Sequence, residues 1–453
     1  MELVDRKKVN FLLFSYFLFF LFGAIFKLAS NPAGYTPSIY DLGQIFGVWG
    51  LTAMVFQISM VSRTKALERN VGLDNIMGWH KFNGIFLFLL ILFHPVLIFS
   101  KDFLSGISII SIVGSFTWYY WLGESAFLLL VFSLSVTFIS KWFDYDYEKW
   151  KIAHRSGYIV FILAFIHSFF SGTDISPGTP LYYWWYILLG VGLAAIARRL
   201  WVVYIKPYNF QIVSINKETH NSRTISLKPI AGSLFDFRPG QFAFVRFYSK
   251  NLSSEEHHFT LSGPPGKGTI SFTIKESGDY TGKLGALKVN DFAKVDGPYG
   301  VFDHSRIDGE YLFIAAGIGI TPLMSMLKGM IKNKSENENK DNKKKQDKNE
   351  KDLILIYANK TPKDVVFKKE LEKMKKTKKI KKLVFIFSKE KGKEKGSYKG
   401  HVNKKILKKE VKDIKKRKVF LVGPAGFMKS VKKDLRALGV PDEHVFSEKF
   451  MLR

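Results

Sequence analysis

Residues 80–94 read HKFNGIFLFLLILFH, an apolar stretch bounded at both ends by histidine, and this stretch decides the fold. A second stretch of the same kind, HRSGYIVFILAFIH, occupies residues 154–167. Ionisable side chains within long apolar segments are costly in a membrane and usually functional. A single intramembrane histidine would serve as readily for hydrogen bonding between helices. Two pairs with nearly equal spacing favour a shared role as ligands.

The two histidine stretches belong to an N-terminal half that is rich in Phe, Leu and Ile. Stretches with about the twenty residues that a membrane helix needs run roughly over 10–29, 42–61, 82–99, 118–140, 156–171 and 181–205. The first follows Arg6, Lys7 and Lys8, as in a signal peptide, but no small-residue cleavage site is evident. We therefore predict an all-α bundle of six transmembrane helices over residues 1–206.

Positive charges alternate between the two sides of this predicted bundle. The cation-rich loops carry Arg6, Lys7 and Lys8, then Arg63, Lys65 and Arg69, then Lys141, Lys149, Lys151 and Arg155, and last Arg198, Arg199 and Lys206. The opposite loops hold little beyond Lys27 and Lys101. The positive-inside rule then predicts a multi-pass protein of the cell membrane with both termini and the C-terminal half in the cytosol.

Composition narrows the chemistry further. The chain of 453 residues has a formal net charge of +29, of which residues 1–206 contribute only +5, from 16 basic and 11 acidic residues. The basic excess is therefore in the second half, where it favours anionic lipid or phosphorylated substrates over nucleic acid. Because cysteine is absent, disulfides and thiolate metal sites are excluded. Any metal or haem must be held by histidine, methionine or oxygen.

The spacing of the four histidines predicts how they pair. His80 and His94 are 14 residues apart, roughly 21 Å along a helix and about 40° short of four turns, so both rings can lie on one side. Parallel spans then place His80 beside His154 near the cytosolic face and His94 beside His167 near the outer face, and each pair offers two imidazoles to a haem. The 13-residue spacing of His154 and His167 fits an ideal helix less well, because the two rings would point about 140° apart around the helix axis. Helix tilt, a tight turn near Gly157 or different rotamers would have to absorb the difference.

The second half of the chain reads as two soluble domains. Alternating stretches such as 210–215 and 241–247, separated by turns such as Arg238-Pro239-Gly240, predict an antiparallel β-barrel over 207–305. From 306 to 453, apolar strands at 311–316, 353–357, 382–387 and 419–422 predict an α/β Rossmann-like domain. A glycine-rich turn after its first strand, Gly317-Ile-Gly319-Ile-Thr321-Pro322, is typical of a pyrophosphate site. Residues 331–351, rich in Lys, Asn and Glu, read as a disordered surface insertion.

Together these features resemble the NADPH oxidase and ferric reductase superfamily. The resemblance rests on the histidine spacings of 14 and 13 on alternate spans, on His258-Phe259-Thr260-Leu-Ser262, and on the glycine-rich turn. It implies two b-type haems with axial ligands His80, His154, His94 and His167. It also implies an FAD site made of His258, Phe259, Thr260, Ser262, Lys275, Gly278, Tyr280, Thr281 and Phe450.

The resemblance further implies a site for NADPH or NADH, with NADPH slightly preferred. Its residues would be Gly317, Gly319, Thr321, Pro322, Lys360, Ser388, Lys389, Gly423, Pro424 and Met428. Arg63 and Arg155 are candidates for pairing with haem propionates, although a purely topological role explains them equally well. Lys27 is a similar candidate on the outer side, unless it snorkels to the surface.

The chain departs from the family pattern in a few places. Val422 replaces the cysteine that relatives place near the nicotinamide, which puts the efficiency of hydride transfer in doubt but not the fold. Ser388-Lys389 stands where relatives that use NADPH have Ser-Arg, and lysine lacks the bidentate fork of arginine. Three residues follow Phe450, so the aromatic C-terminus that covers the flavin is matched inexactly.

The implied activity is electron transfer from cytosolic NAD(P)H through FAD and the inner haem to the outer haem and an external acceptor. Three acceptors remain open: O₂, giving superoxide as in an NAD(P)H oxidase; ferric or cupric chelates; and a separate outer-face protein or quinone. The expected partners are the lipid bilayer and O₂ or ferric complexes, with no nucleic acid and no obligatory protein partner.

Overall fold

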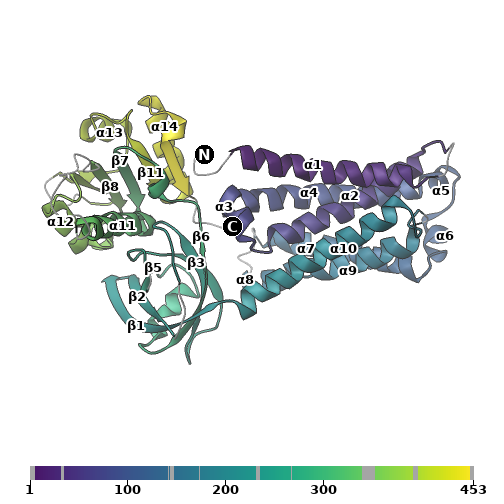
Figure 1. The fold of residues 1–453 in the computed structure, drawn as a ribbon, viewed down its shortest axis with the longest axis horizontal. Helices are drawn as coiled ribbons and strands as arrows, with labels where there is room; N and C mark the ends of the chain where they lie inside the picture. The colour runs from purple at the N-terminus through teal and green to yellow at the C-terminus, as the bar shows by residue number, and fades with distance from the viewer. Residues whose placement is uncertain are drawn as a thin grey trace. The chain divides into compact units, whose positions relative to one another are not determined.

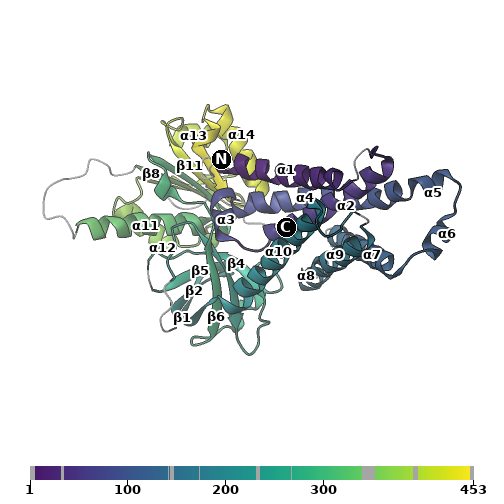
Figure 2. The same cartoon turned by 45° about the vertical axis from the view of Figure 1, so that its right-hand side comes forward.

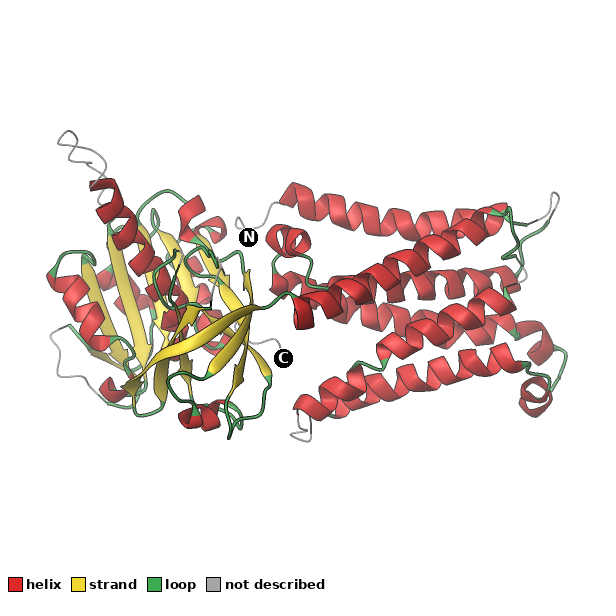
Figure 3. Ribbon diagram, turned by 60° about the horizontal axis from the view of Figure 1, so that its bottom comes forward, coloured by secondary structure: helices red, strands yellow, loops and turns green. Residues whose placement is uncertain are grey.

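The computed structural model describes residues 6–31, 35–140, 142, 147–172, 174–230, 235–266, 268–338, 352–390 and 396–448. Its contacts divide the chain into two compact units. One consists of residues 6–67 and 75–202, and the other holds residues 68–74 and the chain from Val203 onward. Helices make up the first unit, and nearly all strands in Figure 3 belong to the two sheets of the second. The predicted multidomain fold class is confirmed.

The first unit contains six helical segments that are long and apolar enough to cross a membrane, as predicted. They comprise α1 (Arg6–Ala29), α2 (Ile39–Met60), α4 (Leu73–Ile98), α7 (Trp118–Ile139), α8 (Tyr147–His154) with α9 (Gly157–Ser171), and α10 (Pro180–Leu200). These long helices run side by side in Figure 1. Shorter helices α3 (Lys65–Val71), α5 (Ser100–Leu104) and α6 (Ile109–Gly114) lie in the connections. The third span begins at Leu73 and not near 82, with Asp74 in its first turn, where a carboxylate suits the helix dipole.

Burial within the bundle separates a packed interior from an apolar outer face. Half of the apolar window of α2 is buried, against 11% for α1. Phe11, Phe14 and Phe17 on α1 are between 59% and 67% exposed. Such large apolar side chains facing outward are typical of a surface in contact with lipid. The α2 helix is therefore the central element against which the histidine-bearing helices pack.

The barrel of the second unit has six strands in the order β4-β3-β6-β1-β2-β5, all antiparallel. They are β1 (Tyr208–Thr219), β2 (Ser222–Pro229), β3 (Phe242–Tyr248), β4 (Glu256–Thr260), β5 (Ile270–Lys275) and β6 (Phe292–Tyr299). A single antiparallel bridge between Leu261 and Phe272 connects the two edges of the sheet. That bridge closes the barrel around a core that includes Phe210, Val245 and Phe272.

The second sheet is parallel, with the strand order β10-β9-β8-β7-β11-β12. Its strands are β7 (Tyr311–Ala316), β8 (Leu353–Asn359), β9 (Lys382–Phe387), β10 (Tyr398–Lys399), β11 (Lys418–Val422) and β12 (Val445–Glu448). The strand β7 has β8 as its neighbour on one side and β11 on the other, so the strand order reverses direction at β7. This reversal is the switch point beside which open α/β sheets bind ligands, at the carboxyl ends of the strands.

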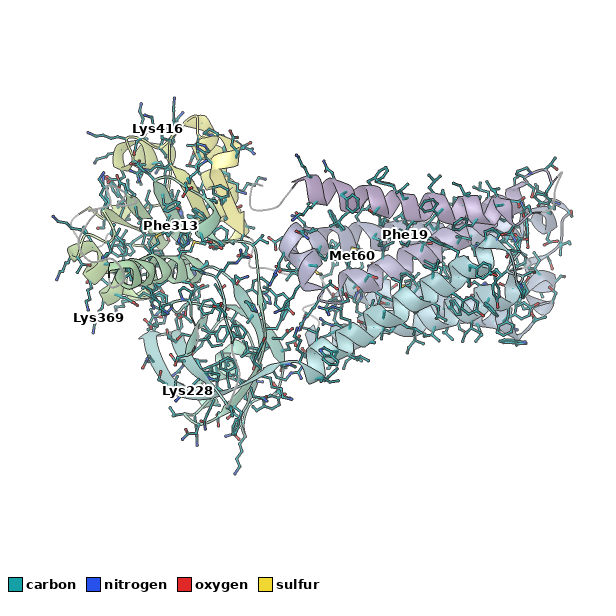
Figure 4. The ribbon with its side chains drawn as sticks, viewed as in Figure 1. Phe19, Met60, Lys228, Phe313, Lys369 and Lys416 are labelled. Carbon is teal, nitrogen blue, oxygen red and sulfur yellow. The ribbon has the colours of Figure 1, made fainter. Side chains whose placement is uncertain are left out.

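Helices cover both faces of the parallel sheet. One face packs on α11 (Ile320–Glu338) and α12 (Lys368–Lys376), and the other packs on α13 (Lys404–Glu410) and α14 (Ala425–Ala437). The two layers can be followed in Figure 2. Phe313 of β7 lies inside this domain, whereas Lys369 and Lys416 project from its surface (Figure 4). Much of the basic excess of the second half is thus solvated surface.

The predicted insertion at 331–351 differs in part from the structure. The α11 helix continues through Glu338, so the first residues of that segment are helical. Lys and Glu have good helix propensity, so a helix through this part of the segment is compatible with its composition. Residues 339–351 lie outside the described residues.

A buried guanidinium holds together the amino ends of the parallel strands. Arg417, only 1% exposed, donates to both carboxylate oxygens of Asp413 at 2.7 and 2.8 Å, to Asp352 Oδ2 at 3.0 Å and to the Tyr311 carbonyl at 3.1 Å. This arginine lowers the pKa of Asp413 to about 2. Arg417 thus connects Asp413 and Asp352, and Lys381 is a second cation beside Asp352.

We expect Arg417→Met to lower the free energy of unfolding of the nucleotide-binding domain by roughly 3 kcal/mol, because it removes the buried donor to Asp413 and to the main-chain carbonyls of Tyr311 and Asp352. Denaturant unfolding of the full chain, followed by loss of bound flavin, measures this. Arg436→Met is the matched control, since Arg436 also bonds an aspartate at 2.7 Å but both side chains are 65% exposed. An unfolding midpoint that moves equally in the two variants would contradict the assignment.

Candidate functional site

The four histidines of the first unit come together in two pairs. His80 and His94 lie on α4, His154 ends α8, and His167 lies on α9. The ring centres of His80 and His154 are 6.0 Å apart. Metal–imidazole bonds of roughly 2 Å put two rings that share one ion about 6 Å apart, so the separation of this pair matches that of two ligands of one ion. His94 lies against Gly43 of α2, and His167 lies against Tyr119 of α7.

Hydrogen bonds from Nδ1 to main-chain carbonyls fix which ring nitrogen is available in two of the four histidines. Nδ1 lies 2.7 Å from the Gly43 carbonyl in His94 and 2.8 Å from the Tyr119 carbonyl in His167. In His154 it lies 3.3 Å from the Thr137 hydroxyl. A carbonyl only accepts, so Nδ1 of His94 and His167 carries the proton and Nε2 keeps its lone pair. Metal-binding histidines are commonly held in this way.

Two glycines leave room for the imidazole rings of His94 and His167. A methyl group on Gly47 would come within 2.9 Å of the His94 ring, and one on Gly123 within 2.7 Å of the His167 ring. Real Cβ atoms do not approach so closely, so any larger residue would displace the imidazole. Neither glycine was singled out from the sequence, although both lie within predicted spans and would have been visible as exceptions to the apolar pattern.

A break in the fifth span accounts for part of the helical phase mismatch. Helix α8 ends at His154 and α9 begins at Gly157. At the start of α9, Tyr158 and Ile159 donate to the carbonyls three residues earlier, as in a 3₁₀ turn. A 3₁₀ helix turns through about 120° per residue, against about 100° in an α-helix, so each such residue moves His167 toward the phase of His154. The structure therefore contains a tight turn near Gly157, which is one of the three explanations.

The cations proposed for haem propionates occupy different surroundings. Arg155 is exposed directly after His154, and the carbonyl of Arg63 accepts a hydrogen bond from Arg198 at 3.2 Å. Lys27, only 1% exposed, lies 2.5 Å from Asp41 Oδ1 and 3.0 Å from Asp174 Oδ2. Its charge is therefore neutralised by two carboxylates, and it does not snorkel.

The flavin motif on β4 divides between the two faces of the strand. His257 and Phe259 share one face, and His257 stacks on Tyr280 with ring centres 4.0 Å apart. His258 lies on the other face, 6.1 Å from the rings of both Phe242 and Phe244. Because residues alternate along a strand, His257 and not His258 accompanies Phe259 and Tyr280. The sequence analysis missed His257, which the same two-residue period would have indicated.

The remaining flavin residues have structural contacts of their own. Thr260 is buried, and the hydroxyl of the buried Ser262 lies 2.8 Å from that of Thr273. Thr281 Oγ1 accepts from the amides of Ser277 and Gly278, both at 3.0 Å, so these amides are already used in shaping the loop. Burial raises the pKa of the Tyr280 phenol, which therefore stays neutral. Phe450 lies outside the described residues.

Two adjoining cavities of about 220 and 390 Å³ lie at the switch point of the parallel sheet and beside the barrel. The first is lined by the predicted residues Gly317, Lys360, Ser388 and Pro424. Positive φ at Gly317, together with open space at its Cβ position, leaves room for a phosphate group near the turn. The lining also includes Asn359, His401 and Phe427, which the sequence analysis missed.

The second cavity is strongly basic. Lys275, Lys360, Lys363 and Lys389 line it, with Asp364 as its one carboxylate. Such a concentration of positive charge favours a phosphorylated ligand. Lys275, assigned to the flavin from the sequence, lines both cavities beside the nucleotide residues.

The other predicted nucleotide residues shape these cavities and do not line them. A Cβ on Gly319 would come within 3.1 Å of the Val422 carbonyl, and one on Gly423 within 2.9 Å of Ala316. Thr321 donates to the Ile318 carbonyl at the start of α11, where Pro322 follows it. Met428 is buried in the core of the domain. Val422, at the family's cysteine position, is fully buried as well.

Comparison with known proteins agrees with this architecture. Residues 46–165 match the family described as ferric reductase like transmembrane component, and residues 313–433 match the oxidoreductase NAD-binding domain. The chain is 28% identical over 249 residues to the NADH oxidoreductase HCR of Escherichia coli (strain K12), covering 54% of this chain and 68% of that protein. It is 24% identical over 247 residues to the respiratory burst oxidase homolog protein F of Arabidopsis thaliana, covering 46% of this chain and 25% of that protein.

Among solved structures, the flavohaem-like FAD/NAD binding domain of nitric oxide dioxygenase from Vibrio cholerae O1 biovar El Tor matches with a TM-score of 0.45 and 21% identity, over 53% of this chain and 98% of that one. The paired membrane and nucleotide-binding families define an oxidoreductase with a multi-pass membrane domain and a module for FAD and NAD(P)H. The chain belongs to the NADPH oxidase and ferric reductase superfamily.

We expect Lys275→Ala to raise the KM for NADPH roughly 10- to 100-fold, as for a lost hydrogen bond to a charged group, and to leave the FAD content unchanged. Steady-state kinetics and flavin absorbance on the same preparation measure both effects. Lys283→Ala, at an exposed lysine outside both cavities, is the control. Loss of FAD with an unchanged KM would return Lys275 to the flavin site.

Proposed function

We propose that this chain moves electrons across a membrane from cytosolic NADPH, using FAD and two b-type haems, to O₂ on the outer face, where superoxide forms. The observation that carries the proposal is the two histidine pairs, in which Nδ1 of His94 and His167 is bonded to main-chain carbonyls and Nε2 is left for iron. When bound, FAD accepts a hydride and releases electrons singly, and haem iron passes single electrons onward.

Residues of the second unit would bind and orient the donor. The turn at Gly317 and the end of β9 at Ser388 line a cavity suited to a dinucleotide. The basic cavity formed by Lys275, Lys360, Lys363 and Lys389 supports NADPH over NADH, because a 2′-phosphate adds charge to the ligand. The face with His257, Phe259 and Tyr280 would hold the flavin.

Residues of the first unit would hold the haems. His80 with His154 would bind the haem nearer the cytosol, and His94 with His167 the haem nearer the outer face. Arg63 and Arg155 are suited to the inner propionates by charge. Reduction of ferric chelates is a second candidate function, favoured by the match of residues 46–165 to ferric reductase like membrane components.

The membrane assignment is tested by the absorbance spectrum of the purified, haem-loaded chain. We expect two low-spin haems per chain, with one lost in His94→Leu and one in His80→Leu, because each variant lacks one axial ligand. We also expect NADPH-dependent reduction of cytochrome c that superoxide dismutase suppresses. Turnover with anaerobic ferric chelates in place of superoxide formation would favour the second candidate, and turnover with neither acceptor would favour delivery to another protein or to quinone.

We expect Gly123→Ala to lower the haem content from two toward one per chain, because the added methyl would displace the His167 ring. The haem-to-protein ratio measures the effect. Gly190→Ala is the matched control, since a Cβ at that position meets no atom within 4 Å and alanine suits a helix better than glycine. Two haems retained in the Gly123 variant would contradict the role of His167.

A further inference from the structure

A chain of buried polar side chains connects three membrane helices to His80. Tyr16 of α1 donates to Asn83 Oδ1 at 2.7 Å, and Asn83 of α4 donates to Gln57 Oε1 at 2.7 Å. The Gln57 amide nitrogen on α2 then lies 3.0 Å from the His80 carbonyl and 3.1 Å from His80 Nε2. The chain therefore ends on the residue proposed as an inner haem ligand.

Two main-chain carbonyls fix the direction of every bond in this chain. Asn83 also donates to the Ala53 carbonyl at 2.8 Å, so its nitrogen must face α2 and its oxygen must face Tyr16. Gln57 likewise faces the His80 carbonyl with its nitrogen. Each carbonyl accepts only, so neither amide can be reversed. Both hydrogens of the Asn83 amide are used, and the bond to the His80 carbonyl leaves the Gln57 side chain a single orientation.

His80 differs in this respect from the other membrane histidines. Its Nδ1 is buried and finds no hydrogen-bond partner among the residues that the structure describes. His94 and His167 are each held at Nδ1 by a main-chain carbonyl, and His154 lies near the Thr137 hydroxyl. His80 is therefore positioned from a side chain, and Gln57 supplies that contact.

A polar chain in this place has an energetic cost that packing alone would not require. Asn83 is 2% exposed, and an amide within a membrane bundle is costly unless all its groups are paired. Leucine would fill similar space with no such requirement. The small residue Gly84 also faces this side chain, since a Cβ there would approach the Gln57 nitrogen to 3.1 Å.

We propose that Gln57, fixed by Asn83 and Tyr16, is the positioning residue for His80, and that this polar chain is specific to the inner haem site. The proposal rests on the proposed function. The bond from Gln57 to the His80 carbonyl does not involve the ring, so the amide stays packed against the imidazole when iron takes a ring nitrogen. Removal of the amide takes this packing contact away from the ring, which changes the ligand field of the inner haem alone.

The test uses Gln57→Leu in the full, haem-loaded chain, with redox titration and low-temperature electron paramagnetic resonance. Loss of such supporting contacts typically alters metal affinity roughly 10- to 100-fold. We expect the relative affinity of one site for ferrous and ferric haem to change at least tenfold. This corresponds to a shift of about 59 mV in the reduction potential of that haem. The resonance of that haem shifts as well. The haem that changes is the one lost in His80→Leu, and the other is the internal control.

Further variants separate positioning from general damage to the bundle. Asn83→Leu and Tyr16→Phe shift the same haem in the same direction, with Tyr16→Phe giving the smaller shift because only a hydroxyl is removed. Thr52→Val is the control, because Thr52 is also buried on α2 but its hydroxyl bonds only the Val48 carbonyl of its own helix. Tyr16→Phe keeps the test open if Gln57→Leu does not fold.

Two results would overturn the proposal: both haems unchanged in Gln57→Leu, or both haems shifted equally. These outcomes are distinct from a failure of the proposed function, which would appear as the absence of a two-haem spectrum in the unaltered protein. A wild-type chain with two haems and an inner signal insensitive to Gln57 rejects the positioning role alone.

Discussion

Everything in the membrane unit depends on one requirement: a polar group away from water must have a partner. Histidine is tolerated at positions 94 and 167 of α4 and α9 because its Nδ1–H donates to the carbonyl of Gly43 or Tyr119. Lys27 is tolerated because two carboxylates surround it. The same requirement makes the ring nitrogens that remain without partners informative, since they mark the places where something else is expected to bind.

The requirement acts differently at the two levels of the bundle. At the level of His94 and His167 the main chain holds the histidines, and glycines at 47 and 123 let the backbones of α2 and α7 approach them. At the level of His80 and His154, proposed as the inner level, side chains hold the rings. A contact made by a main-chain carbonyl remains when the residue that carries it is substituted. A contact made by a side chain is lost when that residue is substituted. The inner level is therefore the one whose properties evolution can adjust without moving helices.

Much of this architecture was predictable, for identifiable physical reasons. Six spans followed from length and hydropathy, and the barrel and parallel sheet followed from strand periodicity and glycine-rich turns. The pairing of the histidines followed from helical spacing. The side of the strand on which His257 lies was missed because a motif was followed in place of the two-residue period. That Lys275 also lines both cavities was missed because local sequence does not show which residues of the barrel and the nucleotide domain meet. Asn83 and Gln57 were visible as polar residues in apolar spans, but only the folded bundle shows that they meet.

The interruption between α8 and α9 bears on how the membrane domain tolerates insertion and deletion. Adding or removing one residue within an α-helix rotates everything beyond it by about 100°. A length change between His154 and His167 would therefore rotate one ring by about 100° relative to the other. The count of residues between those two histidines is thus a stricter signature of the membrane domain than the identity of the residues that fill it.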